Sequence, residues 1–430
     1  MSPQSPAPET SSSPSSAGAL VRLTLAIAAI VTVALVLGAG DLLIVIIAIL
    51  AMVMLHELGH LLAAKWARMK VTEYFIGFGP RLWSIRRGET TYGVKAIPAG
   101  GYVKIPGMTN LEEVDPADEP RTYRQQPFRK RLVVACAGSF MHYLMAFVLA
   151  WGALVFIGAP SASVVQIQGF TRFQGMTENP AQRAGLRIGD RVIAVDGHAL
   201  RSLDSLSNVI SHDAGKVVHL LVERDGHERT ITVIPVNGVS THNGQTVRPV
   251  AGTQHGYIGV ELTAAAVPEN PVGALGGAAS VVGHTTVNAV TGLAHLFSPH
   301  GISTYIAEVT NPSVAAQDQR SGVARPVSIV GAVREATQGA RAGAGPLIEV
   351  LIAINIFVGL LNMLPMLPLD GGHVAIALYE RVRTRRGRPY YQADAAKLLP
   401  VAYAFMLVLA LLVSSSLYLD ITHPVPNPFG

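Results

Sequence analysis

Two histidines and a glutamate stand together in one apolar stretch of the sequence, as His56-Glu57-Leu58-Gly59-His60. Histidines four residues apart on a helix project from one face, about one turn apart, which is the spacing that holds two corners of a tetrahedral zinc site. In H-E-x-x-H helices the glutamate is not a ligand, because it accepts the proton of the water that attacks a carbonyl. The pattern therefore predicts a hydrolytic zinc site with His56 and His60 as ligands and Glu57 as the general base.

The apolar surroundings of this motif favour a functional site. The surrounding residues are mainly Ile, Leu, Ala and Met, and two histidines and a glutamate buried among them in lipid are costly. The alternative is a polar helix interface that holds no metal. We favour a functional cavity, because ionisable side chains inside a membrane usually mark functional sites.

A catalytic zinc needs a third protein ligand and an open position for water. A later apolar run ends in Asn362-Met363-Leu364-Pro365-Met366-Leu367-Pro368-Leu369-Asp370-Gly371-Gly372. Its two prolines break a helix and its two glycines allow a tight turn, which leaves Asp370 at membrane depth. A dication would neutralise this carboxylate. Alone, Asp370 would fit an ordinary turn aspartate, but together with the histidine helix it is predicted to be the third ligand.

The composition indicates a membrane protein. Half of the 430 residues are hydrophobic and only 14% are charged, a balance poorly suited to one soluble globule. The formal net charge of +5 is more typical of basic cytoplasmic loops than of a nucleic-acid-binding surface, so no nucleic-acid partner is expected. The single cysteine, Cys136, cannot form an internal disulfide and is assigned no role.

Five apolar runs approach the roughly 20 residues that cross a bilayer as a helix. They cover residues 19–38, 42–66, 132–158, about 347–368 and about 398–419. The first run is either an uncleaved extra helix, which we favour, or a secretory signal with a thin charged region. Residues 1–18 are rich in Ser, Pro and Ala and are expected to form a flexible tail.

Basic residues near the apolar runs predict the orientation of the chain. Loops 67–131 and 381–397 are rich in Lys and Arg, so both are expected on the cytoplasmic side. The region 159–346 between them is then extracytoplasmic. Within it, the Gly- and Ala-rich stretch 271–297 is more typical of an interfacial or re-entrant helix than of a span.

The outer region begins with short apolar strands separated by turn residues. Residues 217–223 and 228–236 alternate apolar and polar positions around Asp225-Gly226, which predicts a hairpin. Residues 162–262 resemble a PDZ domain, which presents a sheet edge and a groove to an extended peptide or a chain end. The implied role is recognition. The alternative is a generic small β domain.

Residues 89–105 contain two strand patterns around Pro98 and Gly100-Gly101, which we expect to pair as a hairpin beside the active site. A substrate helix hides its carbonyls in internal hydrogen bonds, so it must unwind before attack. The extended segment then needs partners for its backbone groups, and a neighbouring strand would supply them. A soluble cytoplasmic hairpin fits the same residues.

Several motifs in order resemble those of the site-2 protease family of intramembrane metalloproteases, in its actinobacterial, PDZ-bearing branch of regulated intramembrane proteases. The resemblance covers about residues 42–420. It rests on H-E-L-G-H, Gly77-Phe78-Gly79-Pro80, Ile97-Pro98-Ala99-Gly100-Gly101-Tyr102-Val103-Lys104, the PDZ-like stretch and N-M-L-P-M-L-P-L-D-G-G.

The resemblance implies that His56, His60 and Asp370 bind Zn²⁺, that Glu57 is the general base, and that Asn362 assists near the substrate backbone. It implies a single-span membrane substrate, typically an anti-sigma factor already trimmed by an upstream site-1 protease. Together with the charge pattern, it predicts a multi-pass plasma-membrane protein in the lipid bilayer, with the active site towards the cytoplasm and the PDZ domain outside.

We therefore expect an α-helical polytopic membrane protein with a four-helix protease core, one extra N-terminal span and an inserted extracytoplasmic PDZ-like α+β domain. The expected parts are a tail (1–18), the extra helix (19–38), the core halves (42–158 and 347–420), the PDZ domain (162–262), a connector (263–346) and a C-terminal tail (421–430).

One motif departs from the family pattern. The family usually has Gly-Pro-x-x-Asn in its second core helix, whereas this chain reads Gly138-Ser139-Phe140-Met141-His142. His142 could support the metal site. The alternative, which we favour from sequence, is a histidine on an apolar helix that is satisfied by a neighbouring carbonyl.

Two other functions compete with proteolysis. The first is a PDZ-bearing membrane scaffold with a structural or degenerate metal site, but structural zinc usually has four protein ligands and three are found here. The second is a metal transporter with histidines and an aspartate along an ion path. A transport site needs no glutamate base, so Glu57 favours the hydrolase.

Overall fold

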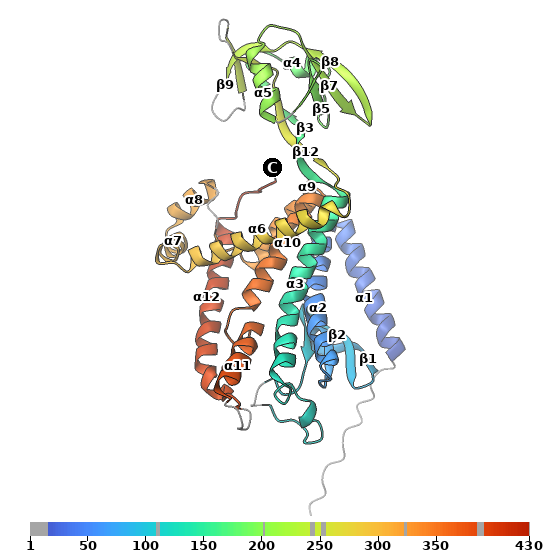
Figure 1. Cartoon of the computed structure of the whole chain (residues 1–430), viewed down its shortest axis with the longest axis vertical. Coiled ribbons are helices and arrows are strands. Elements are labelled where there is room, and N and C mark those ends of the chain that lie inside the picture. The colour runs from blue at the N-terminus through green and yellow to red at the C-terminus, as the bar shows by residue number, and fades with distance from the viewer. Residues whose placement is uncertain are drawn as a thin grey trace, which may run out of the picture. The chain divides into compact units, whose positions relative to one another are not determined.

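The computed structural model describes residues 16–108, 112–200, 203–240, 246–250, 255–321, 325–384 and 391–429. The chain forms two compact units, one of Met1–Ala150 with Gly277–Gly430 and one of Trp151–Gly276. The first unit is mostly helical, and the second contains most of the strands (Figure 1). Of the tail predicted over 1–18, residues 1–15 lie outside the described part of the chain.

Among the described residues, five helices are long and apolar enough to cross a membrane. They are α1 (Ser16–Val36), α2 (Gly40–Trp66), α3 (Phe128–Phe156), α10 (Ala344–Asn362) and α12 (Leu399–Thr422). These helices match the five predicted spans, so the chain is a multi-pass membrane protein. The largest difference from the predicted boundaries is at α10, which ends at Asn362 rather than near residue 368. The segment after it contains Pro365 and Pro368, which cannot continue a helix.

Other helices connect these five. They are α6 (Gly273–Leu296), α7 (Pro299–Thr310), α8 (Pro312–Ser321), α9 (Ile329–Ala342) and α11 (Asp370–Arg383), with the 3₁₀ turns η1 (Glu119–Arg121) and η3 (Ala395–Leu398). The stretch 271–297, predicted to be interfacial or re-entrant, forms the continuous helix α6. This helix is not among the five candidate spans.

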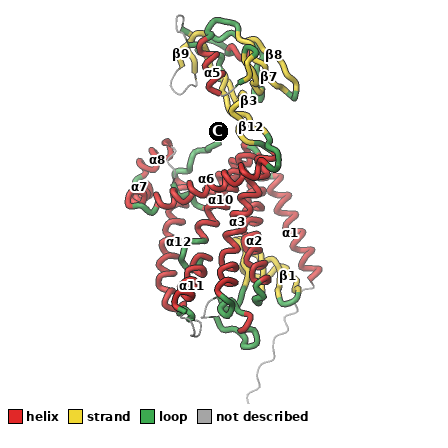
Figure 2. The backbone as a smooth tube through the Cα atoms, in the orientation of Figure 1, coloured by secondary structure: helices red, strands yellow, loops and turns green. Residues whose placement is uncertain are grey.

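Strands β1 (Glu73–Arg87) and β2 (Thr90–Lys104) form an irregular antiparallel sheet in the first unit (Figure 2). The hairpin predicted within 89–105 is wrong in its pairing. Residues near both ends of β2 pair with the start of β1, since Tyr74 faces Tyr92 on one side and Val103 on the other. The two predicted strand patterns therefore flank β1 and do not pair with each other.

A small apolar core joins this sheet to the helices. Buried Leu61 and Ala64 of α2 pack with Val71, Ile105 and Val134, the last of which lies on α3. Tyr74 also donates a hydrogen bond from its hydroxyl to the Met54 carbonyl of α2 at 2.8 Å. The sheet is thereby held against the helix that carries the H-E-x-x-H motif.

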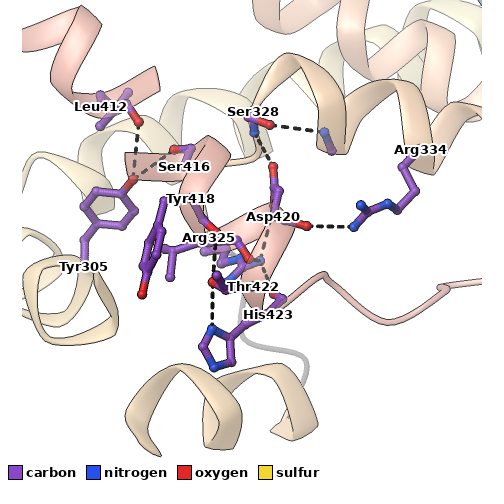
Figure 3. Close-up of polar contacts among 12 residues, drawn as sticks. Tyr305, Arg325, Ser328, Arg334, Leu412, Ser416, Tyr418, Asp420, Thr422 and His423 are labelled. Carbon is purple, nitrogen blue, oxygen red and sulfur yellow. Dashed lines mark hydrogen bonds and ion pairs between the residues drawn. The ribbon is translucent and has the colours of Figure 1, made fainter. Parts of the chain in front are cut away.

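Asp420, near the end of α12, is a buried carboxylate with several partners (Figure 3). Its Oδ2 accepts from the Ser328 backbone N–H at 2.7 Å, and its Oδ1 pairs with Arg325 Nη2 at 3.2 Å. Arg334 of α9 donates to the Asp420 carbonyl at 2.9 Å, and Tyr305 of α7 bonds to serine hydroxyls of α12. Buried charge is tolerated when it is paired in this way, so these contacts fix α12 against α7 and α9.

In its described residues, the second unit contains two sheets. The larger has the order β12-β3-β5-β7-β8, with β6 (His198–Ala199) paired to β5, and the smaller has the order β11-β9-β10-β4. The strands of the larger sheet are β12 (Val260–Val267), β3 (Ala159–Phe170), β5 (Arg191–Val195), β7 (Val218–Arg224) and β8 (His227–Val233). The others are β11 (Gly256–Tyr257), β9 (Val236–Ser240), β10 (Thr246–Pro249) and β4 (Arg172–Phe173), with helices α4 (Pro180–Arg183) and α5 (Leu203–His212).

The hairpin predicted around Asp225-Gly226 is confirmed. Strands β7 and β8 pair antiparallel, with Arg224 opposite His227. Both turn residues have positive φ, 54° at Asp225 and 76° at Gly226, as a tight hairpin turn requires. Beside this hairpin, burial disfavours the charged form of Asp190, but hydrogen bonds from Arg224 outweigh it and hold the pKa of Asp190 below its ordinary value.

Candidate metal centre

Helix α2 brings His56 and His60 to one buried face. Their side chains are only 10% and 8% exposed. Gly59 lies between them in sequence, and a Cβ at that position would stand 2.5 Å from Met141 Cγ and 2.6 Å from the Ala137 carbonyl oxygen. The missing side chain thus lets α2 and α3 approach closely, as small residues do between membrane helices.

Asp370 comes from the other end of the sequence, as the first residue of α11. Its carboxylate lies in the first turn of that helix, where the helix dipole favours negative charge. The two glycines that follow provide space. A Cβ on Gly371 would stand 2.3 Å from the Leu364 carbonyl oxygen, and one on Gly372 would stand 2.7 Å from Leu367 N. The start of α11 therefore packs directly on the proline-containing turn, which places Asp370.

The three predicted donors meet at one point. His60 Nε2 lies 3.3 Å from His56 Nε2 and 3.2 Å from Asp370 Oδ2, and His56 Nε2 lies 3.5 Å from the same oxygen. Two ligands held about 2.0 to 2.1 Å from a tetrahedral zinc ion are about 3.3 to 3.4 Å apart. The donor atoms therefore have the separations that a tetrahedral ion requires, and together they could hold a metal ion.

Helix α3 shapes the other side of this point. A Cβ on Gly138 would stand 2.3 Å from both His56 Cε1 and His60 Nε2, so only glycine leaves room for the two imidazoles. The Val134 carbonyl lies 2.8 Å from His60 Nδ1. A carbonyl only accepts hydrogen bonds, so Nδ1 carries the proton and the Nε2 lone pair faces the site.

Glu57 stands beside the donors on α2 and is held by the sheet. Its Oε2 accepts a hydrogen bond from the Val103 backbone N–H of β2 at 2.9 Å. Val103 is opposite Tyr74 in the strand register, yet its N–H is directed to Glu57 on α2. This edge of β2 therefore faces Glu57.

Asn362 and His142 are the remaining residues that the sequence marked as candidates. Asn362 is the last residue of α10, and its side chain makes no hydrogen bond to any residue that the structure describes. His142 is buried, with its ring centroid 4.9 Å from that of His56. The sequence did not reveal the roles of Gly138 and of the Val103 N–H. Gly138 contributes only the room that the imidazoles need, and the Val103 N–H is a backbone group that residue type does not mark.

Two buried imidazoles and a carboxylate that converge among membrane helices, beside a glutamate, define a membrane-embedded metallohydrolase. The comparison with family models agrees. Residues 44–409 match the model described as Peptidase family M50, so the chain belongs to this family.

Similar proteins match the sequence of this chain over most of their length. The chain is 34% identical over 417 residues to the protein named zinc metalloprotease Rip1 of Mycobacterium tuberculosis (strain ATCC 25618 / H37Rv), covering 89% of this chain and 96% of that protein. It is 30% identical over 408 residues to zinc metalloprotease Rip1 of Mycolicibacterium smegmatis, covering 89% and 97%. It is 26% identical over 388 residues to a putative zinc metalloprotease of Clostridium perfringens, covering 88% and 98%.

Proposed function

We propose that this chain hydrolyses a peptide bond within or near the transmembrane segment of a single-span substrate, with zinc held by His56, His60 and Asp370. The enzyme is a zinc metalloendopeptidase of the site-2 protease type. The observation that carries the residue assignment is the convergence of the three donor atoms at separations of 3.2 to 3.5 Å. We assign no fourth protein ligand, so a position for solvent remains, as a catalytic site requires.

Glu57 acts as the general base in this proposal. When bound, zinc supplies a Lewis acid that polarises a peptide carbonyl and acidifies water. The Glu57 carboxylate takes a proton from the attacking water and later delivers it to the leaving amine. The hydrogen bond from the Val103 N–H holds one oxygen of this carboxylate and thereby orients the group.

The edge of β2 that faces Glu57 is suited to bind the extended substrate. A peptide segment that has left its helix needs partners for its backbone N–H and C=O groups, and these are costly to leave unpaired in lipid. Residues 101–104 of β2 pair with β1 on one side, and the Val103 N–H on the other side is directed to Glu57. A substrate strand added along this edge would bring its scissile carbonyl beside the proposed metal position, within reach of the water that Glu57 deprotonates. Asn362, at the end of α10, would assist on the substrate backbone.

The substrate class and sidedness complete the proposal. The substrate is an anti-sigma factor type of single-span protein, already trimmed by an upstream site-1 protease. The basic loops 67–131 and 381–397 support an active site towards the cytoplasm of a plasma-membrane enzyme. The core consists of α2, α3, α10 and α12 with α1 as an added span. The β-rich unit acts as an extracytoplasmic PDZ-like domain within 162–262, and its hairpin and two sheets support that role.

Glu57→Gln tests the mechanism. The amide keeps the size of the side chain but cannot take a proton, so we expect the purified variant to retain zinc and to lose cleavage of a single-span peptide in proteoliposomes. Glu113→Gln, at an exposed glutamate, is the matched control and should cleave as the wild type does. Continued cleavage by Glu57→Gln would remove Glu57 as the base. Zinc flux into sealed vesicles without peptide hydrolysis would favour a transporter.

A further inference from the structure

His142 occupies the position where the family motif usually has asparagine, and the mechanism above does not use it. It lies on α3 with only 2% of its surface exposed. Its imidazole packs against the ring of His56 on α2, with a centroid separation of 4.9 Å and an interplanar angle of 41°. The same separation joins the rings of His56 and His60. A third imidazole therefore stands next to the two proposed ligands.

A hydrogen-bonded asparagine fixes the tautomer of His142. Asn355 of α10 is fully buried, and its Nδ2 donates to the Leu351 carbonyl at 2.8 Å. The amide oxygen of Asn355 must then be the atom that faces His142 Nδ1, at 2.9 Å. An amide oxygen only accepts, so Nδ1 of His142 carries the proton. In the neutral imidazole, Nε2 of His142 is left with a free lone pair.

His56 has the complementary need. Its Nε2 faces the proposed metal position, so the neutral ring carries its proton on Nδ1. This Nδ1 is buried and has no hydrogen-bond partner among the described residues. The Gly138 backbone also approaches this ring, but it gives Nδ1 no partner with hydrogen-bond geometry. A buried N–H that finds no acceptor is destabilising, and a histidine ligand almost always donates this proton to some group.

We propose that His142 is the positioning residue for His56. Its Nε2 accepts the His56 Nδ1 proton through one bridging water, because no direct bond joins the two atoms in this structure, and Asn355 holds His142 in the tautomer that makes this possible. The result is a series of hydrogen bonds from Asn355 on α10 through His142 on α3 to His56 on α2. The inference rests on the metal site proposed above, and it gives the substitution of the family asparagine a purpose in this chain.

Two substitutions separate this role from simple packing. The amide of asparagine overlaps the Nδ1 position of histidine, so His142→Asn keeps the bond to Asn355 and stops short of His56. The amide of glutamine overlaps the Nε2 position, so His142→Gln loses the bond to Asn355 and still reaches His56. If His142 only joined α3 to α10, asparagine would rescue the protein and glutamine would not.

The measured quantity is the zinc dissociation constant of the full-length protein in detergent, from competition with a chelator. We expect His142→Asn to weaken zinc binding about 10-fold or more, as loss of a partner of a ligand typically does. We expect His142→Gln to stay close to the wild-type constant. Tyr143→Phe, at the neighbouring position of α3, is the control and should also bind as the wild type does.

Wild-type zinc affinity in His142→Asn together with weakened affinity in His142→Gln would overturn the proposal, and so would equal affinities in both. A variant that fails to fold would be recognised by its circular dichroism, and the other then decides alone. Wild-type protein that binds no zinc would overturn the metal site and this inference with it. Zinc binding that is lost in His56→Ala and unchanged in His142→Asn would overturn this inference alone.

Discussion

Gly138 shows how much of the site depends on an absent side chain. The donor residues have the types and spacing that zinc chemistry needs, but their imidazoles fit only because α3 has no Cβ at this point. Gly59 plays a similar part between α2 and α3. At the scale of residues, the proposed metal site therefore depends on three candidate donors and on the space that two glycines leave for them.

Gly138→Ala is expected to disrupt the metal site. The new methyl group would stand 2.3 Å from His56 Cε1 and His60 Nε2, so at least one imidazole must move. We expect zinc affinity to fall by about 10- to 100-fold or more, the range seen when ligand geometry is disturbed. Gly152→Ala, on the same helix, is the control because nothing lies within 4 Å of its added Cβ. Equal zinc affinity in the two variants would contradict the role of Gly138 in making room for the imidazoles.

The sequence singled out the candidate donors because each is a rare polar side chain in an apolar run. His56, His60 and Asp370 stand out by type, and their spacing states which chemistry they suit. Neither the Val103 N–H nor the His142–Asn355 bond could be predicted in this way. The first is a backbone group that every residue but proline has, and the second joins positions 213 residues apart. Such contacts follow from packing between distant elements.

At the scale of elements, α11 must hold Asp370 in place. Near its other end, Glu380 forms an ion pair with Arg131 of α3 at 2.6 Å, with side chains 5% and 4% exposed. Glu380 Oε1 also accepts from the Ala393 N–H at 2.7 Å. This buried pair fixes α11 to α3, the helix that also carries Gly138.

Glu380→Ala should destabilise the helical unit strongly. The change leaves Arg131 with a buried charge and no ion-pair partner at Glu380, which costs about 3 to 5 kcal/mol. The control is Glu89→Ala, whose partner Arg121 is exposed and whose pair contributes about 0 to 1 kcal/mol. Denaturant unfolding in detergent measures both free energies. Similar small losses would show that the buried pair does not anchor α11.

The elements also show which features the sequence patterns predict and which they do not. The hairpin around Asp225-Gly226 was predicted correctly because its turn and both strands are contiguous. The pairing within 89–105 was predicted wrongly because both strand patterns pair with Tyr74 and its neighbours instead. Alternation of apolar and polar residues reveals a strand, but the choice of partner depends on packing outside the strand.

At the scale of the whole molecule, the β-rich unit is an insertion between α3 and the later helices. Its first and last strands, β3 and β12, pair antiparallel, with Pro160 opposite Ala266. The chain therefore enters and leaves this unit at neighbouring points, so the unit can be removed with a short linker. Two roles are open to it, exclusion of bulky untrimmed substrates and binding of a new chain end, and we propose the first, a size filter.

Deletion of residues 162–262 tests the filter. We expect the shortened enzyme to cleave full-length substrate nearly as well as trimmed substrate, while the wild type cleaves only the trimmed form. Cleavage of both forms by each enzyme, measured in proteoliposomes, gives the comparison. Loss of cleavage of the trimmed form in an enzyme that still binds zinc would instead indicate that the domain binds the new chain end.

The central claim is that His56, His60 and Asp370 hold one catalytic zinc between α2 and α11. Its most direct test is elemental analysis of zinc in the purified wild type and in Asp370→Ala, with cleavage of a single-span peptide measured on the same preparations. We predict about one zinc per chain and cleavage in the wild type, and loss of both in the variant. Full zinc content and undiminished cleavage in Asp370→Ala would contradict the account.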